Sequence, residues 1–108
     1  MLALALASCS NVPTQEEVLA DVMNVGMLPK CPNTIVLEAQ RFPTELKALL
    51  VMSDDCVTRW RETMASSRRC DSPDDPFFYL CHSADGTRST HVDFRPKGRV
   101  LVRLGAAQ

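Results

Sequence analysis

The sequence has few of the features that mark large, membrane-spanning or nucleic-acid-binding proteins. Its 108 residues are enough for one small domain and too few for two. No apolar stretch reaches the roughly 18 residues that a membrane-spanning helix needs. Twelve lysines and arginines against thirteen aspartates and glutamates leave a net charge of -1. A nucleic-acid partner normally requires a basic excess, so we expect none here.

Short catalytic and ligand-binding motifs are also missing. The sequence contains no glycine-rich phosphate loop, no G-x-S-x-G nucleophile elbow and no H-E-x-x-H zinc motif. No two cysteines have the C-x-x-C spacing that is typical of structural zinc sites. We therefore expect neither a cofactor nor a metal ion. With 45% hydrophobic and 23% charged residues, the composition is that of an ordinary globular protein.

The start of the chain is a distinct apolar segment. Residues 1–8 are all apolar or small, Cys9 follows at once, and the chain then becomes polar. An apolar segment that ends in small residues is typical of a secretory signal. The motif Leu6-Ala7-Ser8-Cys9 resembles the lipobox of bacterial lipoproteins, in which the cysteine sulfur is acylated and the preceding residues are removed. The resemblance implies lipidation of Cys9 and attachment to a membrane of the bacterial cell envelope.

The residue after Cys9 indicates which membrane the lipoprotein would occupy. Ser10 is not the aspartate that typically retains lipoproteins in the inner membrane, so the resemblance implies the outer membrane in a Gram-negative host. The alternative is that residues 2–8 form a terminal strand or helix and that Cys9 is an ordinary thiol. On the lipoprotein interpretation, the chain divides into a residual signal segment (1–8), a tether (9–13) and one domain (14–108).

The other four cysteines are an even number in a chain with an export signal. They are Cys31, Cys56, Cys70 and Cys81. An oxidising compartment favours two disulfides, and four free thiols are the alternative in the cytosol. A hairpin over residues 35–52 would bring Cys31 beside Cys56, which leaves Cys70 to pair with Cys81. We therefore predict the disulfides Cys31–Cys56 and Cys70–Cys81.

The first half of the domain predicts a helix, a hairpin and a second helix. Thr14-Gln-Glu-Glu17 is a capping box, and Gly26 ends the helix that it begins. Two alternating runs, 35–40 and 46–52, predict strands around a loop at 42–45. The predicted register pairs Ala39 with Ala48, Leu37 with Leu50 and Ile35 with Met52. Ser53 begins the second helix. One long helix over 44–64 is the alternative to the second strand.

The second half predicts a three-stranded meander. Residues 66–76 form a loop, and the runs 77–83 and 88–95 flank Asp85-Gly86, a preferred hairpin turn. Gly98 supplies a left-handed residue for the next turn. The resulting register pairs Tyr79 with Val92 and Val92 with Val102, so one face stays apolar across three strands. The fold class is α+β: a two-layer α-β-β-α-β-β-β domain, with two helices on one face of an antiparallel or mixed five-stranded sheet.

The opposite face of these strands holds the candidate functional residues. It combines apolar and titratable side chains, and it is our candidate interaction face for an envelope protein: Phe78, Leu80, His82, His91, Asp93, Leu101 and Arg103.

Two functional classes follow from that face. The first is a lipid-anchored envelope protein that binds another protein or a wall component, or that is structural. The second is a small extracytoplasmic enzyme that uses His91 as a general base and Asp93 as its orienting group. A concave pocket around His82, His91 and Asp93 would favour the enzyme, and a flat face would favour the binding protein. The short chain has no recognisable catalytic set, which favours the binding protein.

The sequence disfavours two other kinds of site, a cysteine nucleophile and a calcium site. A Cys81–His nucleophile is disfavoured because Cys81 points to the apolar face while His82 and His91 point away. Calcium binding by the aspartates of the loop 66–76 is disfavoured because their spacing matches no known calcium loop.

Overall fold

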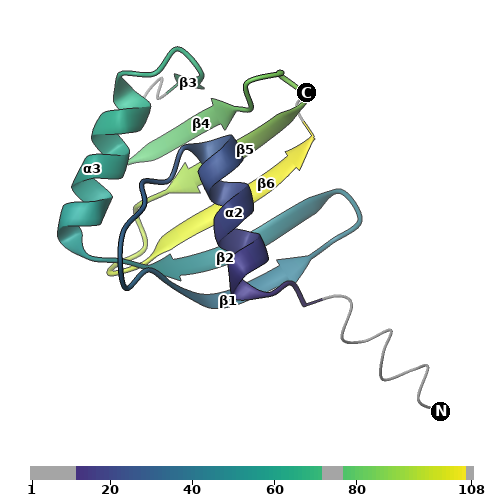
Figure 1. The fold of residues 1–108 in the computed structure, drawn as a ribbon, viewed down its shortest axis with the longest axis horizontal. Coiled ribbons are helices and arrows are strands. Elements are labelled where there is room, and N and C mark those ends of the chain that lie inside the picture. The colour runs from purple at the N-terminus through teal and green to yellow at the C-terminus, as the bar shows by residue number, and fades with distance from the viewer. Residues whose placement is uncertain (1–11, 72–76, 107–108) are drawn as a thin grey trace.

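The computed structural model describes residues 12–71 and 77–106, which form two helices and one six-stranded antiparallel sheet (Figure 1). The predicted α+β class is therefore confirmed, whereas the predicted number of five strands is wrong. The sixth strand is β3 (Cys70–Asp71), which lies inside the segment 66–76 that was expected to be a loop. Its two residues pair with Cys81 and Leu80.

Helix α2 (Gln15–Gly26) begins at the predicted capping box. The Thr14 hydroxyl accepts a hydrogen bond from the Glu17 backbone N–H at 3.1 Å, and the Glu17 carboxylate accepts one from the Thr14 backbone N–H at 3.0 Å. The helix ends at Gly26, as predicted, and the residue that adopts the left-handed conformation after it is Met27, at φ 59°. Gly26 instead packs against the second helix.

The first hairpin joins β1 (Ile35–Arg41) to β2 (Glu45–Val51). The predicted pair Ala39–Ala48 is confirmed, but a bulge at Leu37 shifts the register beyond it. Leu50 therefore lies opposite Val36, and the predicted pairs Leu37–Leu50 and Ile35–Met52 are wrong. The extra residue lets Val36 and Ala39 both pack against the core, while Leu37 remains 46% exposed.

Helix α3 (Asp54–Ala65) begins at Ser53, as predicted, and the alternative of one helix over 44–64 is excluded by β2. The Ser53 hydroxyl accepts a hydrogen bond of 3.1 Å from the backbone N–H of Cys56. Asp54 and Asp55 in the first turn place negative charge near the positive end of the helix dipole, which stabilises the helix.

Strands β4 (Phe78–His82), β5 (Arg88–Asp93) and β6 (Val100–Ala106) form the meander in the predicted register. Tyr79 lies opposite Val92, and Val92 lies opposite Val102. Strand β6 then pairs antiparallel with β2, which closes the order β1-β2-β6-β5-β4-β3. The last strand therefore joins the meander to the first hairpin.

The core lies between the helices and one face of the sheet (Figure 1). Both helices contribute buried side chains, with Val18 and Val22 from α2 and Trp60 and Met64 from α3. The sheet contributes alternate residues of its central strands, among them Leu46, Ala48, Leu50, Val92, Val100, Val102 and Leu104. Neither described helix is long and apolar enough to cross a bilayer.

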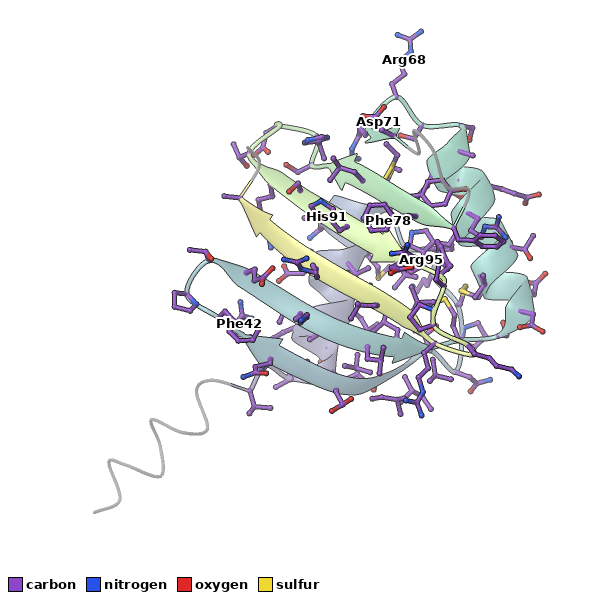
Figure 2. The ribbon with its side chains drawn as sticks, turned by 180° about the vertical axis from the view of Figure 1, so that it is seen from behind. Phe42, Arg68, Asp71, Phe78, His91 and Arg95 are labelled. Atoms are coloured by element: carbon purple, nitrogen blue, oxygen red, sulfur yellow. A yellow bond between two sulfur atoms is a disulfide. The ribbon has the colours of Figure 1, made fainter. Side chains whose placement is uncertain are left out.

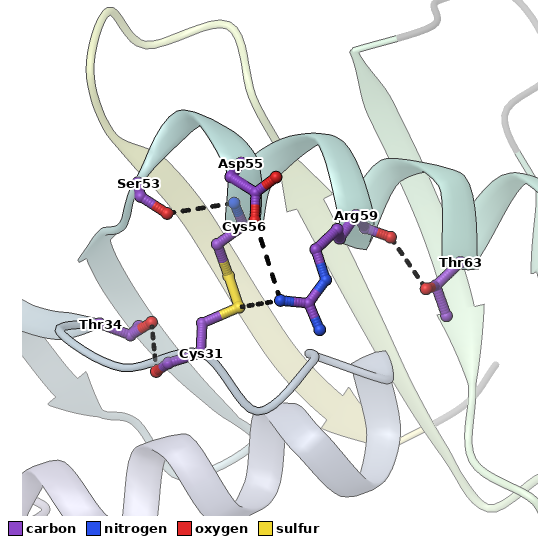
Figure 3. A network of polar contacts seen from close by, with 7 residues as sticks. All are labelled: Cys31, Thr34, Ser53, Asp55, Cys56, Arg59 and Thr63. Atoms are coloured by element: carbon purple, nitrogen blue, oxygen red, sulfur yellow. Dashed lines mark hydrogen bonds and ion pairs between the residues drawn. A yellow bond between two sulfur atoms is a disulfide. The ribbon is translucent and has the colours of Figure 1, made fainter.

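Both predicted disulfides are present. Cys31–Cys56 ties the segment between α2 and β1 to the first turn of α3, with a Cα–Cα distance of 6.1 Å (Figure 3). Arg59 lies beside this bridge, with its Nη1 4.0 Å from the Cys31 sulfur and 3.9 Å from the Asp55 carboxylate. Cys70–Cys81 links β3 to β4 at a directly opposed pair. Both bridges therefore lie on the helix-covered side of the sheet.

Candidate functional site

The face of the sheet that points away from the helices is the candidate site, and we call it the outer face (Figure 2). No described helix lies on it. Its side chains alternate along each strand with the buried residues of the core. All seven candidate residues lie on it: Phe78, Leu80 and His82 from β4, His91 and Asp93 from β5, and Leu101 and Arg103 from β6.

The register brings these residues together as predicted. Asp93 lies between Phe78 on one neighbouring strand and Leu101 on the other. His91 lies between Leu80 and Arg103 in the same way. The outer face is therefore a mixed surface in which half-buried apolar side chains adjoin titratable ones.

A hollow of about 590 Å³ opens on this face. Its polar lining comes from four strands, with His82 from β4, His91 and Ser89 from β5, Arg103 from β6 and Glu45 from β2. Arg103 Nε donates a hydrogen bond to the Glu45 carboxylate at 3.1 Å, and this ion pair is partly exposed to solvent. The hollow is thus concave and of mixed polarity, since Leu80 and Leu104 also line it, and Asp93 is not part of its lining.

His91 is held in its neutral form more strongly than a histidine in water. Partial burial lowers its pKa, and the guanidinium of Arg103 on the adjacent strand lowers it further. Glu45 raises the pKa and His82 lowers it, both as weaker effects. The Phe78 ring lies 5.9 Å from the imidazole, which explains part of the burial.

Asp93 does not orient His91. Both of its carboxylate oxygens accept hydrogen bonds from the Arg95 guanidinium at 2.9 Å, and Oδ1 also accepts from the Arg95 backbone N–H. These bonds lower the pKa of Asp93. Within residues 12–71 and 77–106, no hydrogen bond joins Asp93 to His91. The dyad that the enzyme interpretation requires is therefore not assembled.

The hollow also lacks an activated nucleophile among the described residues. The hydroxyl of Ser89 donates to the Ala106 carbonyl oxygen at 3.5 Å rather than to a histidine. Cys81, the other nucleophile weighed from the sequence, is consumed by its disulfide with Cys70. The concave shape alone fits the enzyme interpretation, whereas the hydrogen bonds do not supply the base, orienting group and nucleophile that catalysis would need.

The described part of the chain holds no grouping of three histidine, cysteine, aspartate or glutamate side chains that could bind a metal ion. Its four cysteines are paired in disulfides, so they are not thiolate ligands. Of the loop aspartates weighed for calcium, Asp71 lies in β3, and Asp74 and Asp75 lie outside the described residues.

Three residues of the site were not identified from the sequence. Lys47 and Glu45 reach the outer face only because β2 pairs with β6, which sets Lys47 opposite Arg103. That pairing joins strands separated by about half the chain, and nothing local in the sequence signals it. Ser89 could have been identified, since it follows from the hairpin register that placed His91.

The proposed lipid-bearing residue, Cys9, lies outside the described residues, as does most of the tether 9–13. Comparison with protein-family models, with curated proteins and with solved structures finds no match for the chain.

Proposed function

We propose that the protein is a small lipid-anchored module of the bacterial cell envelope that binds an envelope partner, either a protein or a wall component, through the outer face of its sheet. Export is supported by the two disulfides, which persist in oxidising compartments. Anchoring is supported by Leu6-Ala7-Ser8-Cys9 and by the short tether that separates Cys9 from the domain.

One observation carries the binding function. Both helices and both disulfides lie on one side of the sheet. On the other side, Phe78, Leu80 and Leu101 lie half-buried beside the hollow. An apolar patch next to convergent polar groups is typical of a recognition surface. The absence of an assembled dyad at His91 favours binding over catalysis.

The experiment is site-specific photo-crosslinking in living cells of the native host. A photoreactive amino acid replaces Gln40, an exposed residue opposite Lys47, or Leu101 on the outer face. The matched control replaces Met23, which is 40% exposed on α2.

We expect an envelope protein or wall fragment to be linked from positions 40 and 101 and not from position 23. Equal products from all three positions, or a product from position 23 alone, would contradict the proposal.

A further inference from the structure

The outer face carries a row of basic side chains that crosses three adjacent strands. Lys47 on β2 lies directly opposite Arg103 on β6, and Arg103 lies directly opposite His91 on β5. We call these three residues the basic row. Neighbouring strands are about 4.8 Å apart, so the row is roughly 10 Å long.

The carboxylates on this face neutralise the row only in part. Glu45 binds Arg103 through Nε alone, so the other four N–H donors of that guanidinium have no partner among the described residues. Asp93 is bound on both oxygens by Arg95, and Glu38 on β1, which lines a hollow together with Lys47, forms no ion pair with Lys47. In the parts of the chain that the structure describes, neither Lys47 nor His91 forms an ion pair.

The Lys47–Arg103 pair in this row is unfavourable for the isolated protein, whereas the neutral His91 adds no repulsion. Like charges that lie directly opposite on adjacent strands are destabilising. Arg103 and Lys47 are exposed, so solvent weakens this repulsion without removing it. Residues that break a local rule of stability without a compensating contact are found at functional sites. Glu45 compensates Arg103 in part, whereas Lys47 has no ion-pair partner among the described residues.

Apolar groups flank the basic row. Leu49 on β2 lies opposite Leu101 on β6, one step along the same face from Lys47 and Arg103. A second hollow of about 300 Å³ lies there, lined in part by these two leucines, by Lys47 and by Glu38. The larger hollow, with His82 and Ser89, lies on the other side of Arg103. A ligand on the row would therefore contact apolar as well as charged surface.

We propose that the basic row binds the carboxylates of an acidic surface patch on a partner protein. This inference rests on the proposed binding function and names the chemistry of the partner. Carboxylates a few ångströms apart would match the spacing of Lys47, Arg103 and His91, and Glu45 already demonstrates carboxylate contact with Arg103. The flanking leucines favour a partner that also carries apolar groups, as a protein surface does and polyphosphate does not.

The test measures binding of poly-L-glutamate to the full chain by isothermal titration calorimetry at neutral pH and low ionic strength. The double variant Lys47→Gln/Arg103→Gln removes two charges of the row. The matched control, Arg68→Gln/Lys97→Gln, removes one arginine and one lysine from exposed positions away from the row (Figure 2 shows Arg68 projecting from the turn before β3).

We expect the row variant to bind about tenfold more weakly, since each exposed ion pair contributes up to about fivefold. The control should stay within about twofold of the original protein because its charges lie off the row. Unchanged binding by the row variant, or an equal loss in the control, would overturn the inference. Since removing the row relieves repulsion, we expect the variant to remain folded, which its thermal unfolding curve checks.

Inorganic polyphosphate serves as the competing probe. Tighter binding of polyphosphate than of poly-L-glutamate, with the same dependence on the row, would overturn the assignment to an acidic protein. If photo-crosslinking from positions 40 and 101 succeeds while poly-L-glutamate does not bind, this inference fails and the proposed function stands. If photo-crosslinking fails as well, both fail.

Discussion

The indole Nε1 of Trp60 donates a buried hydrogen bond of 2.8 Å to the backbone carbonyl oxygen of Gly26. The bond joins the middle of α3 to the last residue of α2, where a carbonyl has no partner within its own helix. A Cβ at position 26 would lie 3.2 Å from the Thr90 side chain and 3.6 Å from the Trp60 ring. Glycine therefore lets the two helices and β5 meet closely.

Replacing Trp60 by phenylalanine should lower the free energy of unfolding by about 2 kcal/mol. The change leaves the Gly26 carbonyl without its donor and leaves a cavity where the larger ring packed against Phe94. Urea denaturation followed by circular dichroism measures the loss. The control is Thr63→Ala on the same helix, since Thr63 is exposed and its hydroxyl donates to the Arg59 carbonyl of the same helix. A similar loss in both variants would refute the role given to Trp60.

Removing the Cys31–Cys56 bridge with Cys31→Ser and Cys56→Ala should cost about 3.5 kcal/mol, because its 25-residue loop constrains the unfolded chain. Removing Cys70–Cys81, which closes 11 residues, should cost about 3 kcal/mol on the same model. Chemical denaturation of the two variants under oxidising conditions provides both values. A loss below about 1 kcal/mol for either pair would show that the bridge does not constrain the chain in this way.

Changing Lys47 to glutamate should raise the free energy of unfolding by about 0.5 kcal/mol, because it replaces repulsion by attraction opposite Arg103. The same variant should lose affinity for poly-L-glutamate. Lys97→Glu, which changes the net charge equally away from the sheet, should alter neither property. A decrease in stability for Lys47→Glu would contradict the view that the basic row destabilises the isolated protein.

His91 should make stability depend on pH near neutrality. Burial and Arg103 lower its pKa in the folded state, so the unfolded chain takes up a proton at higher pH than the folded one. Stability is therefore fully present above the unfolded pKa of about 6.5 and falls as pH decreases through it. Glu45, His82 and Arg103 all face this imidazole and remain in place in His91→Gln.

The measurement is the urea midpoint across this range for the original protein and for His91→Gln, with His82→Gln as the control. The fall in midpoint toward acid should shrink in His91→Gln and persist in His82→Gln. An unchanged profile in His91→Gln would show that another group controls the dependence.

Local signals in the sequence predicted most of the elements. The capping box at Thr14, the Ser53 cap and the Asp85-Gly86 turn each act within a few residues, and each lies where it was expected. Asp85 also accepts three hydrogen bonds from Ser83 and Thr87, which lower its pKa to about 2 and fix the turn. The hairpin registers followed from these turns and from alternation of apolar residues.

The features that were missed depend on distant or competing interactions. The bulge at Leu37 breaks the alternation because the core accepts Val36 and Ala39 instead. Strand β3 has only two residues, and its pairing follows the Cys70–Cys81 bridge rather than any strand propensity. The basic row required knowledge that β6 pairs with β2, so only the histidine and arginine of the row were identified beforehand.

Export and anchoring at Cys9 form the claim on which the rest of the account depends, and peptide mass spectrometry of the protein purified from its native host tests it most directly. Under non-reducing conditions the measurement identifies both the N-terminal residue and the cysteine pairs. We predict a mature chain that starts at a lipid-modified Cys9, together with linked peptides for Cys31–Cys56 and Cys70–Cys81. An intact Met1 with unmodified Cys9, or four free thiols, would contradict the account.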